Sequence, residues 1–362
     1  MLILGIESSC DETAAAVVEN GFHIRSSVIA SQVGLHRKYG GVVPELAARE
    51  HVMSIGPIVR QACGEAGVRY GDFDAIAVTY GPGLVGSLLA GISYAKAMSM
   101  SLGTPLVAVN HIEGHIYAAI MERLADSTKE SSTPSLPALA LVVSGGHTSL
   151  FLVLRHSSGT GFQYQLIGRT RDDAAGEAYD KVAKMLGLGY PGGPIIDRLA
   201  PFGNPKAVPF TKTKISDQSL DFSFSGIKTA VLRYVQKSSI RPLDPRTHHD
   251  EKDVPPIMID LAASFQRTVV DILVRSLQRG MLEYHPKSIL LSGGVAANSE
   301  LRSAVQNFCA EHKLEAYIPP PRLTTDNAAM IAAAGHDHFQ RQELADLNLN
   351  AEASLQLAKK IQ

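Results

Sequence analysis

The chain has 362 residues but no tryptophan and only three cysteines. Cys10, Cys63 and Cys309 have the spacing of neither a zinc knuckle nor a disulfide framework, which favours a reducing compartment. No apolar run approaches the ~20 residues that span a bilayer, since the longest, residues 88–102, is broken by a glycine, a lysine and several serines. The composition therefore predicts a protein that does not cross a membrane.

An excess of charge of either sign is also lacking, because the formal net charge at pH 7 is −1. Any contact with nucleic acid must then use a local basic patch. The chain opens on a strand-like apolar run at residues 1–6, without a basic or serine-rich leader, so we expect a cytoplasmic location. Its length and a hydrophobic content of 45% predict two domains or one large two-lobed fold.

A local pattern occurs twice along the chain. Residues 2–6 and 14–18 are predicted strands around a polar turn, and residues 139–143 and 149–154 repeat this arrangement. The repeat predicts a duplicated α/β fold with a cleft between its halves. Further strands are predicted at residues 74–80, 106–109 and 288–292, and helices at residues 88–102, 173–186 and 257–284.

Two histidines, His111 and His115, lie four residues apart directly after one predicted strand. On a helix this spacing puts both imidazoles on one face, where they can bind a single metal ion. Glu113 does not follow His111 directly, so the pattern differs from the H-E-x-x-H motif of zinc peptidases. With Asn110 as N-cap, Glu113 should point away from the metal and close a capping box. The spacing alone also fits two buried structural histidines.

Six segments, taken together, resemble the motifs of one family, the tRNA threonylcarbamoyltransferases, formerly called O-sialoglycoprotein endopeptidases. They occur in the family's order and cover nearly the whole chain. The segments are residues 5–13 (Gly-Ile-Glu-Ser-Ser-Cys-Asp-Glu-Thr), 111–115, 144–148 (Ser-Gly-Gly-His-Thr), 172–181, 190–194 (Tyr-Pro-Gly-Gly-Pro) and 325–330 (Thr-Asp-Asn-Ala-Ala-Met).

The resemblance implies the duplicated two-lobed α/β fold of actin, the sugar kinases and the heat-shock chaperone ATPases (the ASKHA fold), with a central cleft. We place the N-terminal lobe at residues 1–135 and the C-terminal lobe at residues 136–340. The second lobe includes a predicted tRNA-contacting insertion near residues 200–256. Residues 341–362 form a C-terminal tail.

The resemblance also implies an activity. It is the transfer of a threonylcarbamoyl group from threonylcarbamoyl-AMP to N6 of the adenosine beside the anticodon, in tRNAs that read codons starting with A. Bacterial relatives work with a smaller paralogue of the same fold and a P-loop ATPase subunit, and we expect both partners and a bacterial origin here. The alternatives are a small-molecule kinase of this fold, a metal-dependent peptidase and a non-catalytic scaffold.

By match to the family, His111, His115 and Asp326 bind one divalent metal ion, with iron expected rather than zinc. A carboxylate as third ligand leaves coordination positions open, as a catalytic site requires. Without the resemblance, Asp326 would be interpreted as the N-cap of the helix that begins at Asn327.

The resemblance further implies residues that bind the donor, among them a glycine turn whose backbone N–H groups approach a phosphate. The alternatives are a plain hairpin for the turn, a solvated acidic face paired with Lys181 and Lys184 for Asp180, and a helix cap for Asn298. The expected binding residues are Val142, Val143, Ser144, Gly145, Gly146, Asp180, Gly193, Asp197 and Asn298.

Asp11 and Glu12 are the expected catalytic residues, which orient the substrate or accept a proton; the alternative is that they only form a turn. No side chain resembles a nucleophile for a covalent intermediate, so we expect the adenine amine to attack the carbamoyl carbon directly. Positive charge gathers in one segment, where we expect contacts with tRNA phosphates; a solvated face is the alternative. The basic residues are Lys206, Lys212, Lys214, Lys228, Arg233, Lys237 and Arg241.

Overall fold

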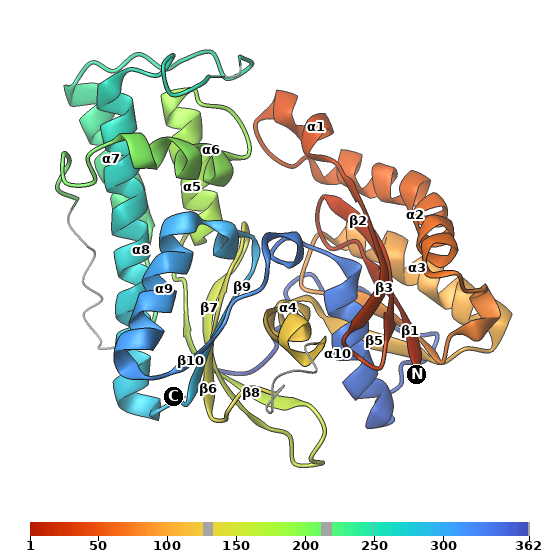
Figure 1. The fold of residues 1–362 in the computed structure, drawn as a ribbon. Coiled ribbons are helices and arrows are strands. Elements are labelled where there is room, and N and C mark those ends of the chain that lie inside the picture. Colours follow the sequence, from red (N-terminus) through yellow and green to blue (C-terminus); the bar gives the residue numbers. More distant parts are fainter. Residues whose placement is uncertain (126–132, 211–218, 248, 361–362) are drawn as a thin grey trace.

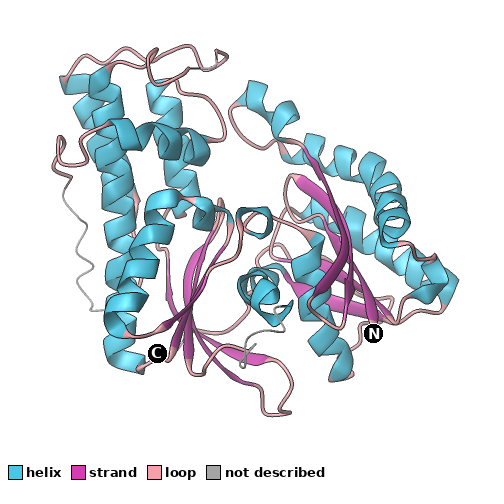
Figure 2. Cartoon of the chain, viewed as in Figure 1, coloured by secondary structure: helices cyan, strands magenta, loops and turns pink. Residues whose placement is uncertain are grey.

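The computed structural model describes residues 1–125, 133–210, 219–247 and 249–360. Two five-stranded sheets form the framework of the fold, and helices cover them (Figures 1 and 2). The first sheet contains β1 (Leu2–Glu7), β2 (Glu12–Glu19), β3 (His23–Ser31), β4 (Ala75–Gly81) and β5 (Leu106–Asn110). The second contains β6 (Ala138–Val143), β7 (Thr148–Arg155), β8 (Phe162–Arg169), β9 (Ser288–Ser292) and β10 (Glu315–Tyr317).

The two sheets have the same topology. The strand order is β3-β2-β1-β4-β5 in one and β8-β7-β6-β9-β10 in the other. In each, three antiparallel strands are followed by two strands parallel to the first, because β4 and β9 pair in parallel with β1 and β6. The predicted duplication is therefore confirmed.

Ten α-helices connect and cover these strands within the described ranges. The predicted helices are all present, and the first of them begins three residues before its predicted start. The helices are α1 (Val33–His36), α2 (Pro44–Ala66), α3 (Val85–Leu102), α4 (His111–Ala125), α5 (Ala175–Leu186), α6 (Gly192–Leu199), α7 (Ser225–Lys237), α8 (Pro256–Tyr284), α9 (Ser299–His312) and α10 (Ala328–Gln340).

The alternation of side chains along β1 separates two cores. Leu4 and Ile6 face α2 and α3 on the outer side of the first sheet, whereas Ile3 faces the inner side, where α10 packs. A Cβ on Gly5 would lie 2.1 Å from the carbonyl oxygen of Ala328, so only glycine lets α10 approach β1 this closely. This contact brings the segment just before α10 to the end of β1.

Helices α4 and α10 lie between the two sheets (Figure 1). A single buried cluster includes residues from both helices and from the inner faces of both sheets. Helix α10 packs on β1 and β2 although it follows the second sheet in sequence, and α4 packs on β9 although it follows the first. The lobes thus share one core, while the boundaries at residues 135 and 340 stay a prediction.

The tail after residue 340 contacts both lobes. The N–H of Ala345 donates to the carbonyl of Leu106 at 2.8 Å, and Lys360 Nζ lies 2.7 Å from each carboxylate oxygen of Asp221. In the part of the chain that the structure describes, no helix is both long enough and apolar enough to cross a membrane.

Candidate metal centre and substrate site

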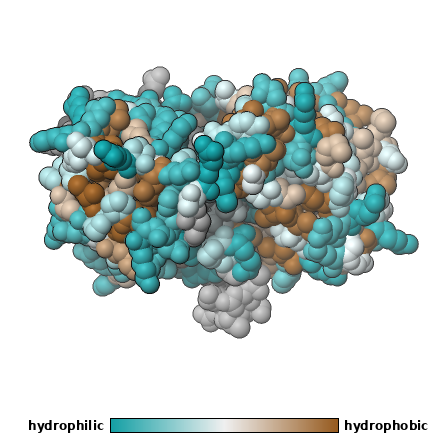
Figure 3. All heavy atoms as spheres, turned by 90° about the horizontal axis from the view of Figure 1, so that it is seen from above, coloured by the Kyte–Doolittle hydropathy of each residue, from teal (hydrophilic) through white to brown (hydrophobic). Residues whose placement is uncertain are grey.

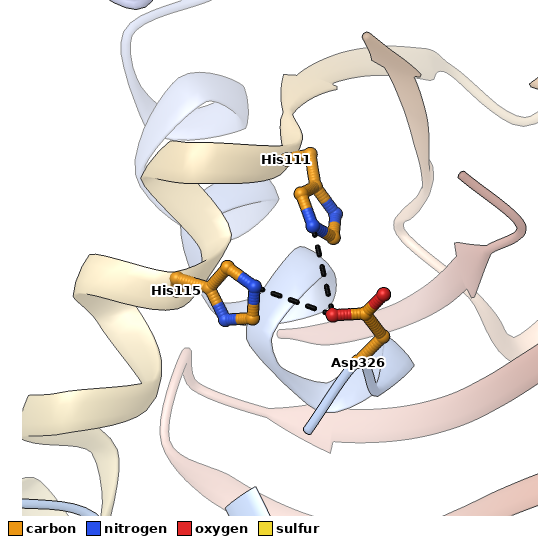
Figure 4. A group of neighbouring side chains, drawn as sticks. All are labelled: His111, His115 and Asp326. Atoms are coloured by element: carbon orange, nitrogen blue, oxygen red, sulfur yellow. Dashed lines mark ion pairs between the residues drawn. The ribbon is translucent and has the colours of Figure 1, made fainter. Parts of the chain in front are cut away.

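His111, His115 and Asp326 meet between the two lobes. His111 opens α4, His115 follows one turn later, and Asp326 lies two residues before α10. The Nε2 atoms of His111 and His115 lie 3.6 and 3.3 Å from the same Asp326 oxygen (Figure 4). One donor atom from each residue falls within 4.8 Å of the others. The structure therefore brings together the three predicted metal ligands.

The caps of the two helices determine which side chains are available as ligands. Asn110 accepts a hydrogen bond from the N–H of Ile112 at 2.9 Å, and Asn327 accepts one from the N–H of Met330 at 3.0 Å. Asn327 is thus the N-cap of α10, and the alternative interpretation of Asp326 as that cap is wrong. The Asp326 carboxylate is directed at the histidines instead.

His115 shows that this donor set suits a metal ion. Its side chain is 0% exposed, and neither ring nitrogen makes a well-aligned hydrogen bond among the described residues; Nε2 has only the contact of 3.3 Å with Asp326. A buried polar atom without a partner is unfavourable, and a metal ion at Nε2 would satisfy it. Two imidazoles and one carboxylate are ligands that first-row divalent metals accept.

Glu7 contacts the ligand His111 at the ring nitrogen that does not face Asp326. It is fully buried at the end of β1, and its Oε2 lies 3.1 Å from His111 Nδ1 and accepts a hydrogen bond from Thr79 at 2.6 Å. Burial lowers the pKa of His111, but Asp326 and Glu7 raise it to about 9 overall. With Nδ1–H donated to Glu7, Nε2 faces Asp326, as in the carboxylate–histidine–metal arrangement. A metal ion must then displace a proton from His111.

Sequence reasoning missed Glu7, although it lies within the quoted motif of residues 5–13. The available signal was a carboxylate at the end of an otherwise apolar strand, since a buried charge requires a partner.

Glu113 does not close the predicted capping box, and that prediction is wrong. Its Oε2 accepts a hydrogen bond from His338 Nε2 at 2.8 Å, which joins α4 to α10. The prediction that Glu113 points away from the metal ligands is confirmed. Glu113 is therefore not placed as the general base of a zinc peptidase would be.

The predicted glycine turn follows β6. Its own backbone closes it, because the N–H of Ser144 donates to the carbonyl of His147 at 2.7 Å. Within the described ranges, the N–H groups of Gly145 and Gly146 have no acceptor, and open space lies beside both α-carbons. The turn can therefore offer two donors to an anion. The residues predicted here are Val142, Val143, Ser144, Gly145 and Gly146.

This turn lies near the triad. Burial lowers the pKa of His147 to about 4, and the charges of His111 and His115 add to this shift. Helix α5 approaches the turn from the other side, since a Cβ on Gly176 would lie 2.7 Å from Gly145.

Asp180 does not belong to a solvated acidic face, so that alternative is wrong. Lys181 pairs with Asp173 and Glu177, each at 2.7 Å. The Asp180 carboxylate instead accepts a hydrogen bond from the N–H of Gly192 at 2.7 Å, and burial raises its pKa to about 6. Gly193, the next predicted residue, has open space beside its α-carbon.

Asp197 and Asn298 are joined by Gln266, which sequence reasoning missed. The Gln266 amide donates to Asp197 at 3.1 Å and accepts from the Asn298 amide at 2.7 Å. Asn298 also caps α9 through the N–H of Leu301, as the alternative interpretation predicted. The Asn298 side chain is therefore engaged within the protein, and its contact with a nucleotide stays a prediction.

Asp11 lies just before β2, and Glu12 is the first residue of that strand. Burial raises the pKa of Glu12 to about 7, although a hydrogen bond from Ser31 opposes the shift. In the described part of the chain, Glu12 Oε2 is buried without a hydrogen-bond partner. Burial also raises the pKa of Asp11, and the charge of Asp11 raises that of Asp180 in the other lobe. The charges of Asp11 and Asp180 therefore act on each other across the two lobes.

The predicted tRNA-contacting residues are only partly described. Lys212 and Lys214 lie outside the described residues. Lys228 pairs with Asp173 at 2.6 Å and is less available to a phosphate. The remaining side chains are exposed, and they are Lys206, Arg233, Lys237 and Arg241.

Comparisons with known proteins cover nearly the full chain. A family model described as tRNA N6-adenosine threonylcarbamoyltransferase matches residues 23–333. A protein of this name from Koribacter versatilis (strain Ellin345) is 50% identical over 381 residues, covering 98% of this chain and 99% of its own. Another from Anaeromyxobacter sp. (strain Fw109-5) is 49% identical over 358 residues, covering 99% of this chain and all (100%) of its own.

Solved structures show the same fold at low sequence identity. HypF of T. kodakarensis aligns with a TM-score of 0.54 at 15% identity, over 94% of this chain and 48% of that chain. Full-length HypF in a phosphate- and nucleotide-bound form gives a TM-score of 0.53 at 13% identity, over 94% and 46%. At these identities the likeness concerns the fold alone, and it confirms the predicted two-lobed fold class.

Proposed function

Because the chain belongs to the tRNA N6-adenosine threonylcarbamoyltransferase family, we propose that it transfers a threonylcarbamoyl group to N6 of an adenosine in tRNA. The donor is threonylcarbamoyl-AMP, and the acceptor is the adenosine beside the anticodon in tRNAs that read codons starting with A. The observation that carries this proposal is the intact triad of His111, His115 and Asp326 close to the glycine turn, in a chain that matches the family over nearly its whole length.

Donor binding uses groups from the second lobe. The free N–H groups of Gly145 and Gly146 hold the phosphate of the adenylate. Asp180 and the open space beside Gly193 receive the nucleoside, and Asp197 and Asn298 complete the site through their bonds to Gln266. An anion bound by fixed backbone dipoles needs little reorganisation as negative charge grows on the leaving phosphate.

His111, His115 and Asp326 would hold one divalent metal ion, for which we propose iron rather than zinc, and which supplies Lewis-acid polarisation of the donor's carbonyl group. Glu7 keeps the His111 ring in the orientation that this requires.

The transfer forms a C–N bond and breaks the bond between the carbamoyl carbon and the phosphate oxygen, so AMP leaves. The attacking amine must also lose a proton. Glu12 accepts it, because a carboxyl group with a pKa of about 7 is half ionised at neutral pH and poised for proton transfer. Asp11 orients the amine. No covalent enzyme intermediate is required.

Protein partners have an available surface on the first lobe. Val52 and Met53 on α2 and Val85 and Leu89 on α3 are between 39% and 73% exposed. Apolar surface also gathers on the half of the molecule that carries α2 and α3 when it is viewed from above (Figure 3). Such a patch indicates a protein interface. We propose that the smaller paralogue binds this face.

A P-loop ATPase subunit completes the proposed assembly. The basic residues near α7 contact tRNA phosphates. We place the reaction in the cytoplasm, where its tRNA substrate would be found.

The test is transfer from labelled threonylcarbamoyl-AMP to an unmodified tRNA that reads such codons, with both partner proteins present. Wild type and His23→Ala, a change at an exposed histidine of β3, should label the tRNA. His111→Ala should not. Absence of label with the folded, metal-loaded wild type and its partners would reject the transferase, and phosphate transfer from ATP to small hydroxyl compounds would then be measured for the kinase alternative.

A further inference from the structure

A buried histidine of α2 holds both ends of the predicted catalytic turn. His51 is 0% exposed. Its Nε2 lies 3.0 Å from the carbonyl oxygen of Cys10, and its Nδ1 lies 2.8 Å from the hydroxyl oxygen of Thr13. The two residues between these contacts are Asp11 and Glu12. One imidazole ring thus bonds to the residues on either side of Asp11 and Glu12.

The partners of the ring fix its protonation. A carbonyl oxygen can only accept, so Nε2 carries the proton and donates it to Cys10, while Nδ1 accepts from the Thr13 hydroxyl. Burial lowers the pKa of His51, which favours this neutral form. Both ring nitrogens are therefore satisfied, and the ring has one orientation.

Glu12 and Thr13 already belong to β2 and pair with Ser31 and Ala30 of β3, so the part that this ladder leaves free is the loop before Glu12. There, other bonds hold the chain at fewer points. Ser87 on α3 donates to the same Cys10 carbonyl at 3.2 Å, and the N–H of Gln32 donates to the carbonyl of Asp11 at 3.1 Å. His51 alone among the described side chains bonds to residues on both sides of the carboxyl pair. Without the His51 ring, the Cys10 carbonyl oxygen would keep only the hydrogen bond from Ser87. The peptide between Cys10 and Asp11 would then be free to rotate.

We propose that His51 is a positioning residue, which fixes the turn so that the carboxyl groups of Asp11 and Glu12 are presented to the attacking amine. This inference rests on the proposed transferase function. It predicts that His51 affects the rate of transfer rather than the binding of either substrate, because a misplacement of about 1 Å in a reacting group lowers rates by about a hundredfold.

Three substitutions separate the two bonds. His51→Gln places an amide donor near the position of Nε2 and can keep the bond to Cys10. His51→Asn places an amide near Nδ1 and can keep only the bond to Thr13. His51→Leu removes both. We expect kcat to fall about a hundredfold for the Leu and Asn variants and less than about tenfold for Gln. KM for donor and tRNA and the affinity for Zn²⁺ should stay within about twofold in all three.

Ser26→Ala is the matched control. Ser26 donates to the carbonyl of Ala62 at 2.7 Å, so it also ties α2 to the first sheet, but it does not touch the turn. This change should lower the melting temperature about as much as His51→Gln and leave kcat unchanged. The proposal is wrong if His51→Leu retains wild-type kcat. It is also wrong if kcat falls in proportion to melting temperature across all four variants and His51→Gln has no higher kcat than His51→Leu.

Amide hydrogen exchange of the peptide covering residues 8–14 gives a readout that needs no activity. Exchange should be faster than in wild type for Leu and Asn and close to wild type for Gln and for Ser26→Ala. Equal exchange in all variants would overturn the inference even if wild type proved unable to transfer label, whereas that inability alone would reject the proposed function.

Discussion

Glu113 Oε2 and His338 Nε2 lie 2.8 Å apart and join α4, which carries two of the metal ligands, to α10, which follows the third. Glu113 is on α4 between His111 and His115, and His338 is on α10, which follows Asp326. Glu113 is only 4% exposed, and its side chain and charge raise the pKa of His338 against the effect of burial. The pair therefore sets the separation of α4 and α10 on the side away from the triad.

Breaking this pair should destabilise the protein and loosen the metal centre. Removing one partner of a buried ion pair costs about 3 kcal/mol, because the other charge is left unpaired. We expect His338→Leu to lower the free energy of unfolding of the first cooperative transition in urea by about this amount, and Glu113→Leu to lower it by less, because His338 keeps its ion pair with Glu343. The double variant should lose about 1–3 kcal/mol less than the sum. Strict additivity would show that the two side chains do not interact.

The support that Glu7 gives to His111 predicts a change in metal affinity. Both Glu7 oxygens accept hydrogen bonds, from Ser9 and Thr79 among others. An amide in Glu7→Gln must direct its NH2 group at one of these donors, so the ring support is disturbed. We expect about a 10–100-fold loss of Zn²⁺ affinity, measured by competition with a chromophoric chelator.

Ser8→Ala serves as the control for this measurement. The Ser8 hydroxyl donates to the carbonyl of Ser87 at 2.9 Å and contacts no ligand. Its Zn²⁺ affinity should match wild type, and an equal loss in both variants would assign the effect to the turn as a whole.

Neighbouring residues before α10 should have separable roles. Asp326→Asn removes a ligand and should abolish tight Zn²⁺ binding, while α10 keeps its cap. Asn327→Ala removes the cap, whose side chain is buried, and should lower the free energy of unfolding by about 1–2 kcal/mol. Its Zn²⁺ affinity should change only a few-fold. Metal titration and urea unfolding of the metal-free protein give both quantities. The assignment would be contradicted if Asn327→Ala abolished Zn²⁺ binding while Asp326→Asn mainly lowered the free energy of unfolding.

The sequence predicted those parts of the fold that depend on local pattern. Strands such as residues 288–292 and helices such as residues 257–284 were predictable because apolar periodicity is local. The repeated hairpins predicted the duplication for the same reason. No local pattern in the sequence predicts that α4 and α10 share one core, because each helix packs on a sheet that is distant from it in sequence.

The site was predictable to the same limited extent. Spacing indicated His111 and His115, but Asp326 required the family resemblance, because Asp326 and Asn327 are equally good caps in sequence. The partner of Glu113 was mispredicted, since a capping box is a local pattern and His338 is not. Glu7, His51 and Gln266 act through bonds to distant residues, so no spacing in the chain reveals them.

The raised pKa of Glu12 predicts the pH dependence of both activity and stability. A base must be ionised, so log kcat should rise with pH below about 7 and level off above it, and Glu12→Gln should lose this dependence together with most activity. The folded-state pKa lies above the ordinary value of 4.5, so stability from this group is present below about pH 4.5 and is lost as pH rises through about 7.

It follows that Glu12→Gln should be more stable than wild type at pH 8 and nearly equal to it at pH 5, since the amide keeps an acceptor for Ser31 and carries no charge. Melting temperatures of the two proteins at both pH values provide the measurement. If Glu12→Gln raised the melting temperature less at pH 8 than at pH 5, the Glu12 carboxyl group would have to be ionised in the folded protein well below pH 7.

The basic side chains near α7 predict how tRNA binding depends on salt. Lys212 and Lys214 lie outside the described residues, so the test uses Arg233 and Lys237, which are exposed on α7. Each phosphate contact contributes about −0.9 to the slope of log affinity against log salt for double-stranded nucleic acid. Arg233→Glu with Lys237→Glu should therefore weaken binding and flatten this slope by about 1–2. Lys287→Glu, a change at another exposed lysine just before β9, should leave the slope unchanged, because Figure 1 places β9 away from α7. An unaltered slope in the double variant would place the tRNA on another face.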